Sequence, residues 1–388
     1  MKKILIIHQS AELYGSDKTI LFFITNLDKA KYQPIVILPF KGPLQVELEK
    51  NNIEVIIAPV LKLYRKIFTP KNILKFFKEY KQGIALLAKL HEKHNFSLVY
   101  SHTLAVLIGL TFSAKFKIKH LWHVQEIIAK PRIFNYLFKK ILSLKCTDKI
   151  VYDSIETMNF WKNGNPKIAA KSDFVWNGLD ISSKINATEE EKTTIRKDFF
   201  NANASNIVFG LVGRINSWKG QQLLLEAFNK IHSKYLNIKL VFIGSAPPNQ
   251  ENFEIDLQNK ITANQLEEKV TIIPFQQEIW KFWDAIDVAV VPSTEPEPFG
   301  MVAIEAMLAK KPVIAANHGG LTEIVLHNET GFLFEPNNSN SLSVFMEDLI
   351  NDTQKIKNFG SSGFERSSSV FSMEQHMAKF YKIFDEIL

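Results

Sequence analysis

The 388-residue chain is long enough for two domains of ordinary size, and its 46% hydrophobic and 22% charged residues exclude a disordered protein. Cys146 is the single cysteine, which excludes a disulfide framework and a cysteine-based zinc site and fits a reducing compartment. The net charge of +7 is uneven: residues 1–180 carry 28 Lys and Arg against 14 Asp and Glu, and residues 181–388 carry 19 against 26. We therefore expect the first half to face an anionic membrane, nucleic acid or phosphorylated ligand.

Apolar and β-branched runs in the first half predict buried strands, with helices between several of them. These runs are 3–8, 33–39, 54–59, 97–101, 120–124 and 148–154. His8 and Gln9 interrupt the first run, so we expect a buried strand there rather than a signal peptide. No apolar run reaches the roughly 18 residues of a membrane span. The alternation predicts a parallel sheet with helical crossovers.

The same pattern restarts in the second half, with strands predicted at 207–213, 238–244, 269–274, 287–292 and 312–316. A helix is predicted over 220–235, and Thr188 with Glu191 fits a capping box at the start of another, over 188–200. We expect two doubly wound α/β domains, whose ligands bind beyond the carboxyl ends of the strands, in the cleft between them. The expected divisions are a first domain, 1–180, joined by a C-terminal helix, 372–388; a linker and helix, 181–205; and a second domain, 206–371.

Two glutamates stand eight positions apart after the strand predicted at 287–292. Glu297 lies in a proline-rich loop, and Glu305 lies about two turns into a helix expected to start near Phe299. A helix start binds phosphate well, and Gly300 lets a ligand approach the backbone closely. The Glu305 carboxylate could accept hydrogen bonds from a ribose diol. The spacing alone also fits an alternative without a ligand. In this alternative Glu297 is a loop acid near the helix dipole, and Glu305 is a solvated surface residue.

A basic loop follows the first strand of the second half. In "GRINSWKG", Arg214 and Lys219 flank a short loop that leads into a helix. This arrangement suits the neutralisation of a diphosphate, although a solvated basic loop is the other reading.

Together these motifs point to one protein family, although each of them alone is a weak signal. The stretches 213–220, 292–325 and 330–336, with "WNGLD" at 176–180, resemble the retaining nucleotide-sugar glycosyltransferases of group 1, also called family 4. The glutamate pair matches the E-x7-E motif of that family, and the basic pair matches its two cations. The resemblance is dense over roughly 207–336 and sparse over 1–180.

The resemblance implies a GT-B fold, with two Rossmann-like domains facing across a cleft and the donor held mainly by the second. It implies that Glu305 binds the donor ribose, that Glu297 contacts the transferred sugar, and that Arg214 and Lys219 hold the diphosphate. His123 aligns with a histidine that contacts the donor sugar; the alternative is a core or surface histidine. The expected donor site also includes Gly213, Gly15, Gly244, Phe275, Ile279 and the backbone N–H groups of Phe299, Gly300 and Met301.

Some residues depart from the pattern of the family or carry a weaker signal. Ser16 and Asp17 replace residues of the glycine-rich loop, and the loops 242–248 and 273–280, near the nucleotide base in the family, are atypical. The base therefore stays open. His102 is a further candidate at a strand end. His91 and His94 have the spacing of a metal pair, but a charged helix end explains them better.

These features predict a retaining hexosyltransferase that uses a UDP-, GDP- or ADP-sugar. Because two cations could neutralise the leaving diphosphate and no Asp-x-Asp occurs, we expect neither metal nor cofactor. The expected acceptor is a glycan or lipid-linked molecule of cell-envelope polysaccharide or lipopolysaccharide synthesis. The alternatives are a nucleotide-sugar epimerase of the same fold and a basic nucleic-acid-binding protein; no nucleic-acid-binding module is recognisable, so no nucleic acid is expected.

Two segments of the basic half mix cations with aromatic and aliphatic residues, namely 61–82 and 130–145. We expect them to lie on an anionic membrane, which would make the protein cytoplasmic and peripheral on the inner face of the cytoplasmic membrane. In the second segment the expected contacts come from Phe134, Tyr136, Phe138, Lys139 and Lys140. Ordinary amphipathic helices with lysine-rich faces are the alternative.

Overall fold

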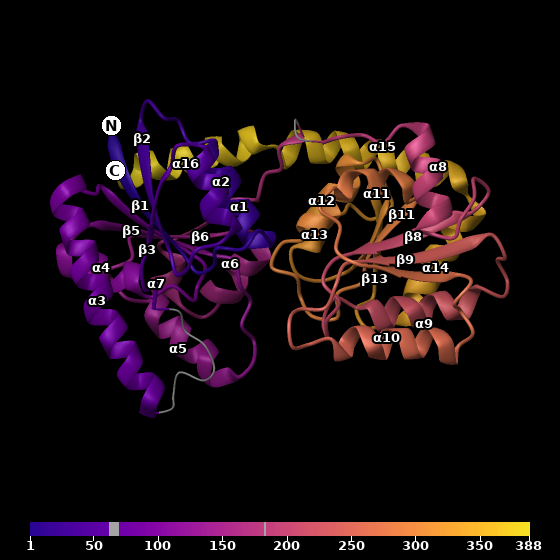
Figure 1. Ribbon diagram of the computed structural model, residues 1–388, viewed down its shortest axis with the longest axis horizontal. Helices are drawn as coiled ribbons and strands as arrows, with labels where there is room; N and C mark the ends of the chain where they lie inside the picture. Colours follow the sequence, from indigo (N-terminus) through magenta and orange to yellow (C-terminus); the bar gives the residue numbers. More distant parts are fainter. Residues whose placement is uncertain (62–69, 182–183) are drawn as a thin grey trace. The chain divides into compact units, whose positions relative to one another are not determined.

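The computed structural model describes residues 1–61, 70–181 and 184–388 (Figure 1). The chain forms two compact units. Unit 1 comprises Met1–Gly178 and Met373–Leu388, and unit 2 comprises Leu179–Ser372. The chain therefore leaves unit 1 once and returns to it for its last helix.

The sheet of unit 1 is parallel, with the strand order β3-β2-β1-β4-β5-β6-β7. Its strands are β1 (Lys2–His8), β2 (Tyr32–Leu38), β3 (Glu54–Ile57), β4 (Leu98–His102), β5 (Lys119–Val124), β6 (Lys149–Tyr152) and β7 (Ser172–Phe174). The strand order reverses between β1 and β4, and ligands of open α/β sheets bind at such a point.

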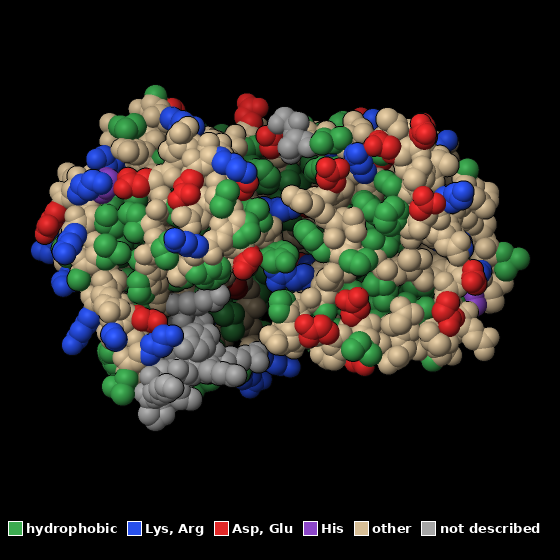
Figure 2. All heavy atoms as spheres, in the orientation of Figure 1, with side chains coloured by type: hydrophobic (Ala, Val, Ile, Leu, Met, Phe, Trp, Pro, Cys, Tyr) green, Lys and Arg blue, Asp and Glu red, His purple; other side chains and the backbone are tan. Residues whose placement is uncertain are grey.

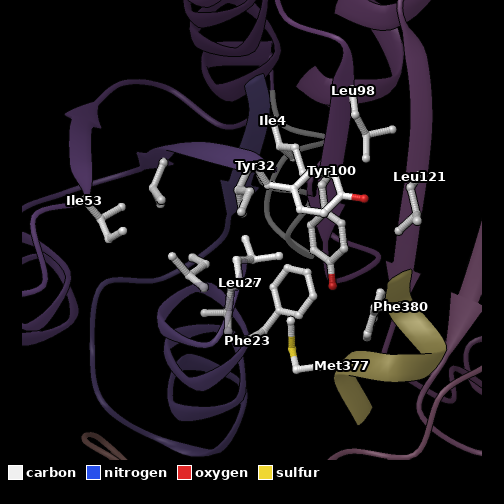
Figure 3. Close-up of a cluster of buried hydrophobic side chains, with 14 of the residues drawn as sticks. Ile4, Phe23, Leu27, Tyr32, Ile53, Leu98, Tyr100, Leu121, Met377 and Phe380 are labelled. Carbon is white, nitrogen blue, oxygen red and sulfur yellow. The ribbon is translucent and has the colours of Figure 1, made fainter. Parts of the chain in front are cut away.

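Helices cover both faces of this sheet, because its central strands are apolar on both sides (Figure 1). They are α1 (Gly15–Thr25), α2 (Pro43–Lys50), α3 (Pro70–His94), α4 (Ile108–Phe116), α5 (Arg132–Leu142), α6 (Ile155–Lys162), α7 (Pro166–Ala169) and α16 (Met373–Ile387). Figure 3 shows Phe23 of α1 with Met377 and Phe380 of α16, lying beside the sheet residues Tyr100 and Leu121. The last helix thus completes the core of unit 1.

Unit 2 repeats the design with the strand order β10-β9-β8-β11-β12-β13, again parallel. Its strands are β8 (Ile207–Val212), β9 (Ile238–Ile243), β10 (Val270–Ile273), β11 (Val288–Val291), β12 (Val313–Ala316) and β13 (Gly331–Phe334). Its helices are α8 (Glu189–Asp198), α9 (Gln221–Ile231), α10 (Asn252–Ala263), α11 (Ile279–Ala285), α12 (Met301–Leu308), α13 (Leu321–Ile324), α14 (Ser339–Asn351) and α15 (Thr353–Val370). Here the order reverses between β8 and β11.

All eleven predicted strands are present, and β7 and β13 are additional. The predicted capping box is confirmed: Thr188 Oγ1 accepts from the N–H of Glu191, and Glu191 Oε2 accepts from that of Thr188. The helix expected near Phe299 begins at Met301 instead. Glu305 is therefore the fifth residue of α12, about one turn in rather than two.

We expect Phe380→Ala to destabilise unit 1 by about 3–5 kcal/mol, the usual cost of emptying a buried phenylalanine site. Phe380 is fully buried, whereas Phe77, in the same unit, is 57% exposed, so Phe77→Ala is the matched control. Hydrogen-exchange mass spectrometry resolves the units: β1, β4 and β5 should exchange faster in Phe380→Ala only. Unchanged exchange in both variants would contradict the place of α16 in this core.

Candidate active site

The loop between β8 and α9 lies tightly against the end of β11. Gly220 has φ +83°, and a Cβ at this position would lie 2.0 Å from the carbonyl oxygen of Pro292. Asn216 Oδ1 accepts hydrogen bonds from the N–H groups of Trp218 and Lys219, which fixes the turn. The turn and the close approach therefore set the position from which the Lys219 side chain extends.

Lys219 and Glu297, predicted as separate site residues, contact each other. Lys219 Nζ lies 2.6 Å from Glu297 Oε1, and the Ser293 hydroxyl donates to the same oxygen at 2.6 Å. Glu297 is only 5% exposed, and these two partners supply the hydrogen bonds that its buried Oε1 needs. Within the described chain neither of these two bonds uses Oε2.

The loop after β12 holds the Glu297 backbone, and its residues were not singled out in the sequence. The N–H of Gly320 donates to the Glu297 carbonyl at 2.8 Å, and a Cβ at Gly319 would lie 2.3 Å from that same oxygen. His318 Nε2 lies 2.8 Å from the Ser293 carbonyl oxygen. Burial lowers the pKa of His318, against the opposing effects of that carbonyl and of Glu297. The available signals were the run "HGG" one residue after a predicted strand and its place in the stretch 292–325, which resembles the family.

The start of α12 has the features of an anion site. Gly300, with φ +121°, is its N-cap, and no side chain caps the helix; the N–H of Ala303 donates to the Gly300 carbonyl, and the N–H groups before it face the start of the helix. Phe299 is buried beside it, at 3% exposure. Glu305 is half-buried, and its Oε2 lies 3.4 Å from the indole Nε1 of Trp283.

The other residues expected at the donor site follow neighbouring strands of the same sheet. Gly244, after β9, lies against the β8 loop, since a Cβ there would be 2.1 Å from the carbonyl oxygen of Gly213. Phe275 follows β10 and is 53% exposed, and Ile279 begins α11. Arg214 is exposed in the β8 loop. All of them lie at the carboxyl edge of the unit 2 sheet.

The residues predicted in the first domain lie in unit 1. A Cβ at Gly15 would meet no atom within 4 Å, so the surrounding protein does not require glycine there. His123 is buried in β5, and its Nδ1 lies 2.7 Å from the Tyr100 hydroxyl. His91 Nδ1 accepts from the N–H of Phe96, and His94 Nε2 lies 3.7 Å from Glu54 Oε1, so separate local contacts account for these two histidines.

Comparisons with known proteins match the sequence to a family. Residues 192–366 match the model of the glycosyl transferases group 1. An uncharacterized glycosyltransferase of Methanocaldococcus jannaschii is 32% identical over 252 residues, which are 64% of this chain and 68% of that protein. The chain belongs to the group 1 glycosyltransferases.

A second relative of this group 1 glycosyltransferase is the capsular polysaccharide biosynthesis glycosyltransferase CapM of Staphylococcus aureus. It is 35% identical over 169 residues, which are 44% of this chain and 43% of the relative. Among solved structures, Anabaena HepE in complex with UDP-glucose superposes with a TM-score of 0.85 at 23% identity, over 100% of both chains. The two-domain GT-B fold is thereby confirmed. Among the residues that the structure describes, no helix of this glycosyltransferase is both long and apolar enough to span a bilayer.

Buried histidines make the stability of unit 1 depend on pH. Burial lowers the pKa of His120 and of His123 to about 3, compared with about 6.5 in an unfolded chain. Between these values the unfolded state binds protons that the folded state does not. The stability that the two neutral imidazoles contribute is therefore complete above pH ~6.5 and is lost as the pH falls toward 3.

We expect His120→Gln to reduce this pH dependence, by up to about 2 kcal/mol between pH 6.5 and 5. Gln can still hydrogen-bond to Ser101 and Thr147, the present partners of His120. The measurement is the urea concentration at which half of unit 1 is unfolded, monitored by hydrogen exchange at pH ~6.5 and at pH ~5. The same loss of stability on acidification in variant and wild type would contradict the prediction.

Proposed function

We propose that this protein is a retaining glycosyltransferase that transfers a sugar from a nucleoside diphosphate sugar to a glycan or lipid-linked acceptor of the cell envelope. Its relative in capsular polysaccharide biosynthesis supports the acceptor class, and the UDP-glucose complex of HepE supports the donor class. The observation that carries the proposal is the contact between Lys219 and Glu297 at the β8–β11 reversal, beside the start of α12.

The proposed chemistry requires positive charge where the sugar–phosphate bond breaks. Cleavage leaves negative charge on the diphosphate, which Lys219, Arg214 and the first N–H groups of α12 would stabilise. An ammonium group has three donors, so Lys219 can keep Glu297 and still bind a phosphate oxygen. No metal is needed in this scheme. The configuration is retained by attack from the side of the leaving group, whose phosphate takes the acceptor proton.

The proposal assigns the two glutamates to different parts of the donor. Glu305 binds the ribose, so Glu305→Gln should weaken the nucleotide and the nucleotide sugar alike, by roughly 10- to 100-fold. Glu297 contacts the sugar, so Glu297→Gln should weaken the nucleotide sugar but leave the free nucleotide nearly unchanged. A thermal-shift screen of UDP-, GDP- and ADP-sugars selects the ligand, and calorimetry measures the affinities.

Glu295→Gln is the matched control, because Glu295 is exposed in the same loop as Glu297. Its affinities should equal those of wild type. Equal effects of Glu297→Gln and Glu305→Gln on the free nucleotide would show that the roles are assigned wrongly. If no nucleotide sugar stabilises the wild-type protein, the proposed donor class is wrong.

We also propose that unit 1 binds an anionic membrane through α5. Some of the contact residues predicted from the sequence are wrong. Phe138 is 5% exposed and packs in a core cluster with Trp122 and Trp161, so it cannot reach a bilayer. Phe134 packs partly against that cluster, and Lys139 Nζ donates to the Asn163 carbonyl.

The exposed apolar face of α5 consists instead of Ile133, Tyr136 and Leu137, which are 73%, 63% and 37% exposed. These positions are three and four apart, so they form one stripe, and the Lys140 ammonium lies 5.1 Å from the Tyr136 ring. On the face drawn in Figure 2, Lys and Arg side chains are spread over unit 1. Of the other predicted segment, residues 62–69 lie outside the described part.

We expect Ile133→Ser with Lys140→Glu to reduce vesicle binding by more than tenfold, because an interfacial apolar side chain and a cation are both lost. Lys89→Glu, at an exposed position of α3, is the control for a general charge effect. Co-sedimentation with vesicles containing anionic lipid, at low and high salt, measures binding. Equal pelleting of wild type and the double variant would contradict the role of α5.

A further inference from the structure

Helix α15 lies closely against α12 and the turn that follows it (Figure 1). A Cβ at Gly360 would lie 2.2 Å from the carbonyl oxygen of Lys310, and a Cβ at Gly363 would lie 3.3 Å from Cγ of Met307. Glycine at these two positions therefore lets the backbone of α15 approach closely. Arg366 is three residues beyond Gly363, so it extends from the same side of α15.

The Arg366 side chain binds the carboxyl end of α13. Its Nε donates to the Ile324 carbonyl at 3.0 Å, and its Nη2 donates to the Glu323 carbonyl at 2.6 Å. The last carbonyls of a helix have no partner within the helix, and a cation suits them because the helix dipole places partial negative charge there. Arg366 thus supplies hydrogen bonds that the end of this four-residue helix lacks.

Helix α13 in turn contacts the candidate donor site. A Cβ at Gly300, the N-cap of α12, would lie 2.7 Å from Cδ2 of Leu321 and 3.4 Å from Cδ1 of Ile324. Gly320, the N-cap of α13, donates its N–H to the Glu297 carbonyl at 2.8 Å. A displacement of α13 would therefore disturb both the start of α12 and the backbone of Glu297.

A second contact of the same guanidinium leads to the same turn. Cζ of Arg366 lies 5.5 Å from the centre of the Phe371 ring, within the range of a cation–π interaction. Phe371 is fully buried, and its ring meets that of Phe299 edge to face, with the centroids 5.9 Å apart. Phe299 directly precedes Gly300. Arg366 is therefore connected to the start of α12 through α13 and through Phe371.

We propose that Arg366 is a positioning residue of the donor site, which contacts no ligand itself but holds α13 and Phe371 where they fix the start of α12 and the backbone of Glu297. This inference rests on the proposed function, in which these groups bind the diphosphate and the sugar. Binding groups act at full strength only when the surrounding structure holds them within a fraction of an ångström. Loss of Arg366 therefore weakens diphosphate binding without removing any group that binds it.

Arg196→Met is the matched control for Arg366→Met, because Arg196 is another arginine of unit 2 that donates mainly to backbone carbonyls. Its partners precede β8 and β11, and they are the carbonyls of Ala285, Asn203 and Asn206 and the carboxylate of Asp287. Arg196 is 7% exposed, so its loss also disturbs packed structure. It lies, however, at the amino edge of the sheet, away from the donor site at the carboxyl edge.

Calorimetry with UDP, GDP and ADP measures the effect on binding. Arg366→Met should lower the affinity for the nucleotide that binds the wild type by about tenfold. Arg366→Lys should recover part of this loss, because an ammonium can still donate to the α13 carbonyls. Arg196→Met should lower the urea concentration at which half of unit 2 is unfolded, yet leave the affinity unchanged. An affinity loss that follows the loss of stability in both methionine variants would make Arg366 merely structural and overturn the inference.

Hydrogen exchange tests the inference without a ligand. The amides of Ala303, Gly320 and Val325 form hydrogen bonds at the start of α12 and in α13. Peptides that contain these amides should exchange faster in Arg366→Met than in the wild type, and Arg196→Met should leave them unchanged. If Arg366→Met does not fold, Arg366→Lys takes its place in both measurements.

The two proposals fail in different ways. If UDP, GDP or ADP binds the wild type and Arg366→Met binds it equally well, the role of Arg366 is wrong although the proposed function stands. If none of the three binds, the proposed donor class fails, and hydrogen exchange alone then decides the role of Arg366. Equal exchange of the three amides in wild type and Arg366→Met would overturn it independently.

Discussion

Parallel strand pairing is the constraint on which both units depend, because it brings the carboxyl ends of all strands to one edge of each sheet. In unit 2 this edge gathers Lys219, Glu297 and the start of α12, although Lys219 and Glu297 are 78 positions apart. In unit 1 it aligns His8, His102 and His123 on adjacent strands. Both groups lie at or beside the point where the strand order reverses. The chemistry proposed for unit 2 thus follows from strand order as much as from residue identity.

The strands were largely predictable because each buried strand is a short apolar run between helices. In the two missed strands that signal is weak or short. β7 is an edge strand of three half-buried residues, Ser172–Phe174, which carry little hydrophobic pattern. β13 is an edge strand that begins with Gly331. The start of α12 was misplaced by two residues, because a glycine N-cap gives a weaker signal than Ser, Thr or Asp.

The residue types of the candidate site were predicted from the sequence, whereas their contacts were not. Spacing and resemblance identified Glu297 and Lys219, but their mutual contact and the support from Ser293 and Gly320 are long-range and depend on tertiary structure. The same limit applies to α5. Its composition indicates an interfacial helix, yet only packing decides that Phe138 faces the core and Tyr136 faces solvent. The contacts of Arg366 with α13 and Phe371 likewise join segments that no sequence pattern connects.

The return of the chain to unit 1 has a consequence for biosynthesis. The α16 side chains Phe380 and Phe384 belong to the unit 1 core, but the ribosome adds them only after all of unit 2. Unit 2, Leu179–Ser372, is contiguous and can fold as soon as it emerges. Until then the nascent unit 1 lacks α16, and the apolar surface that α16 covers in the finished protein stays exposed. This order reverses the usual N-terminal-first sequence and leaves an apolar surface on the first half of the chain until α16 has been made.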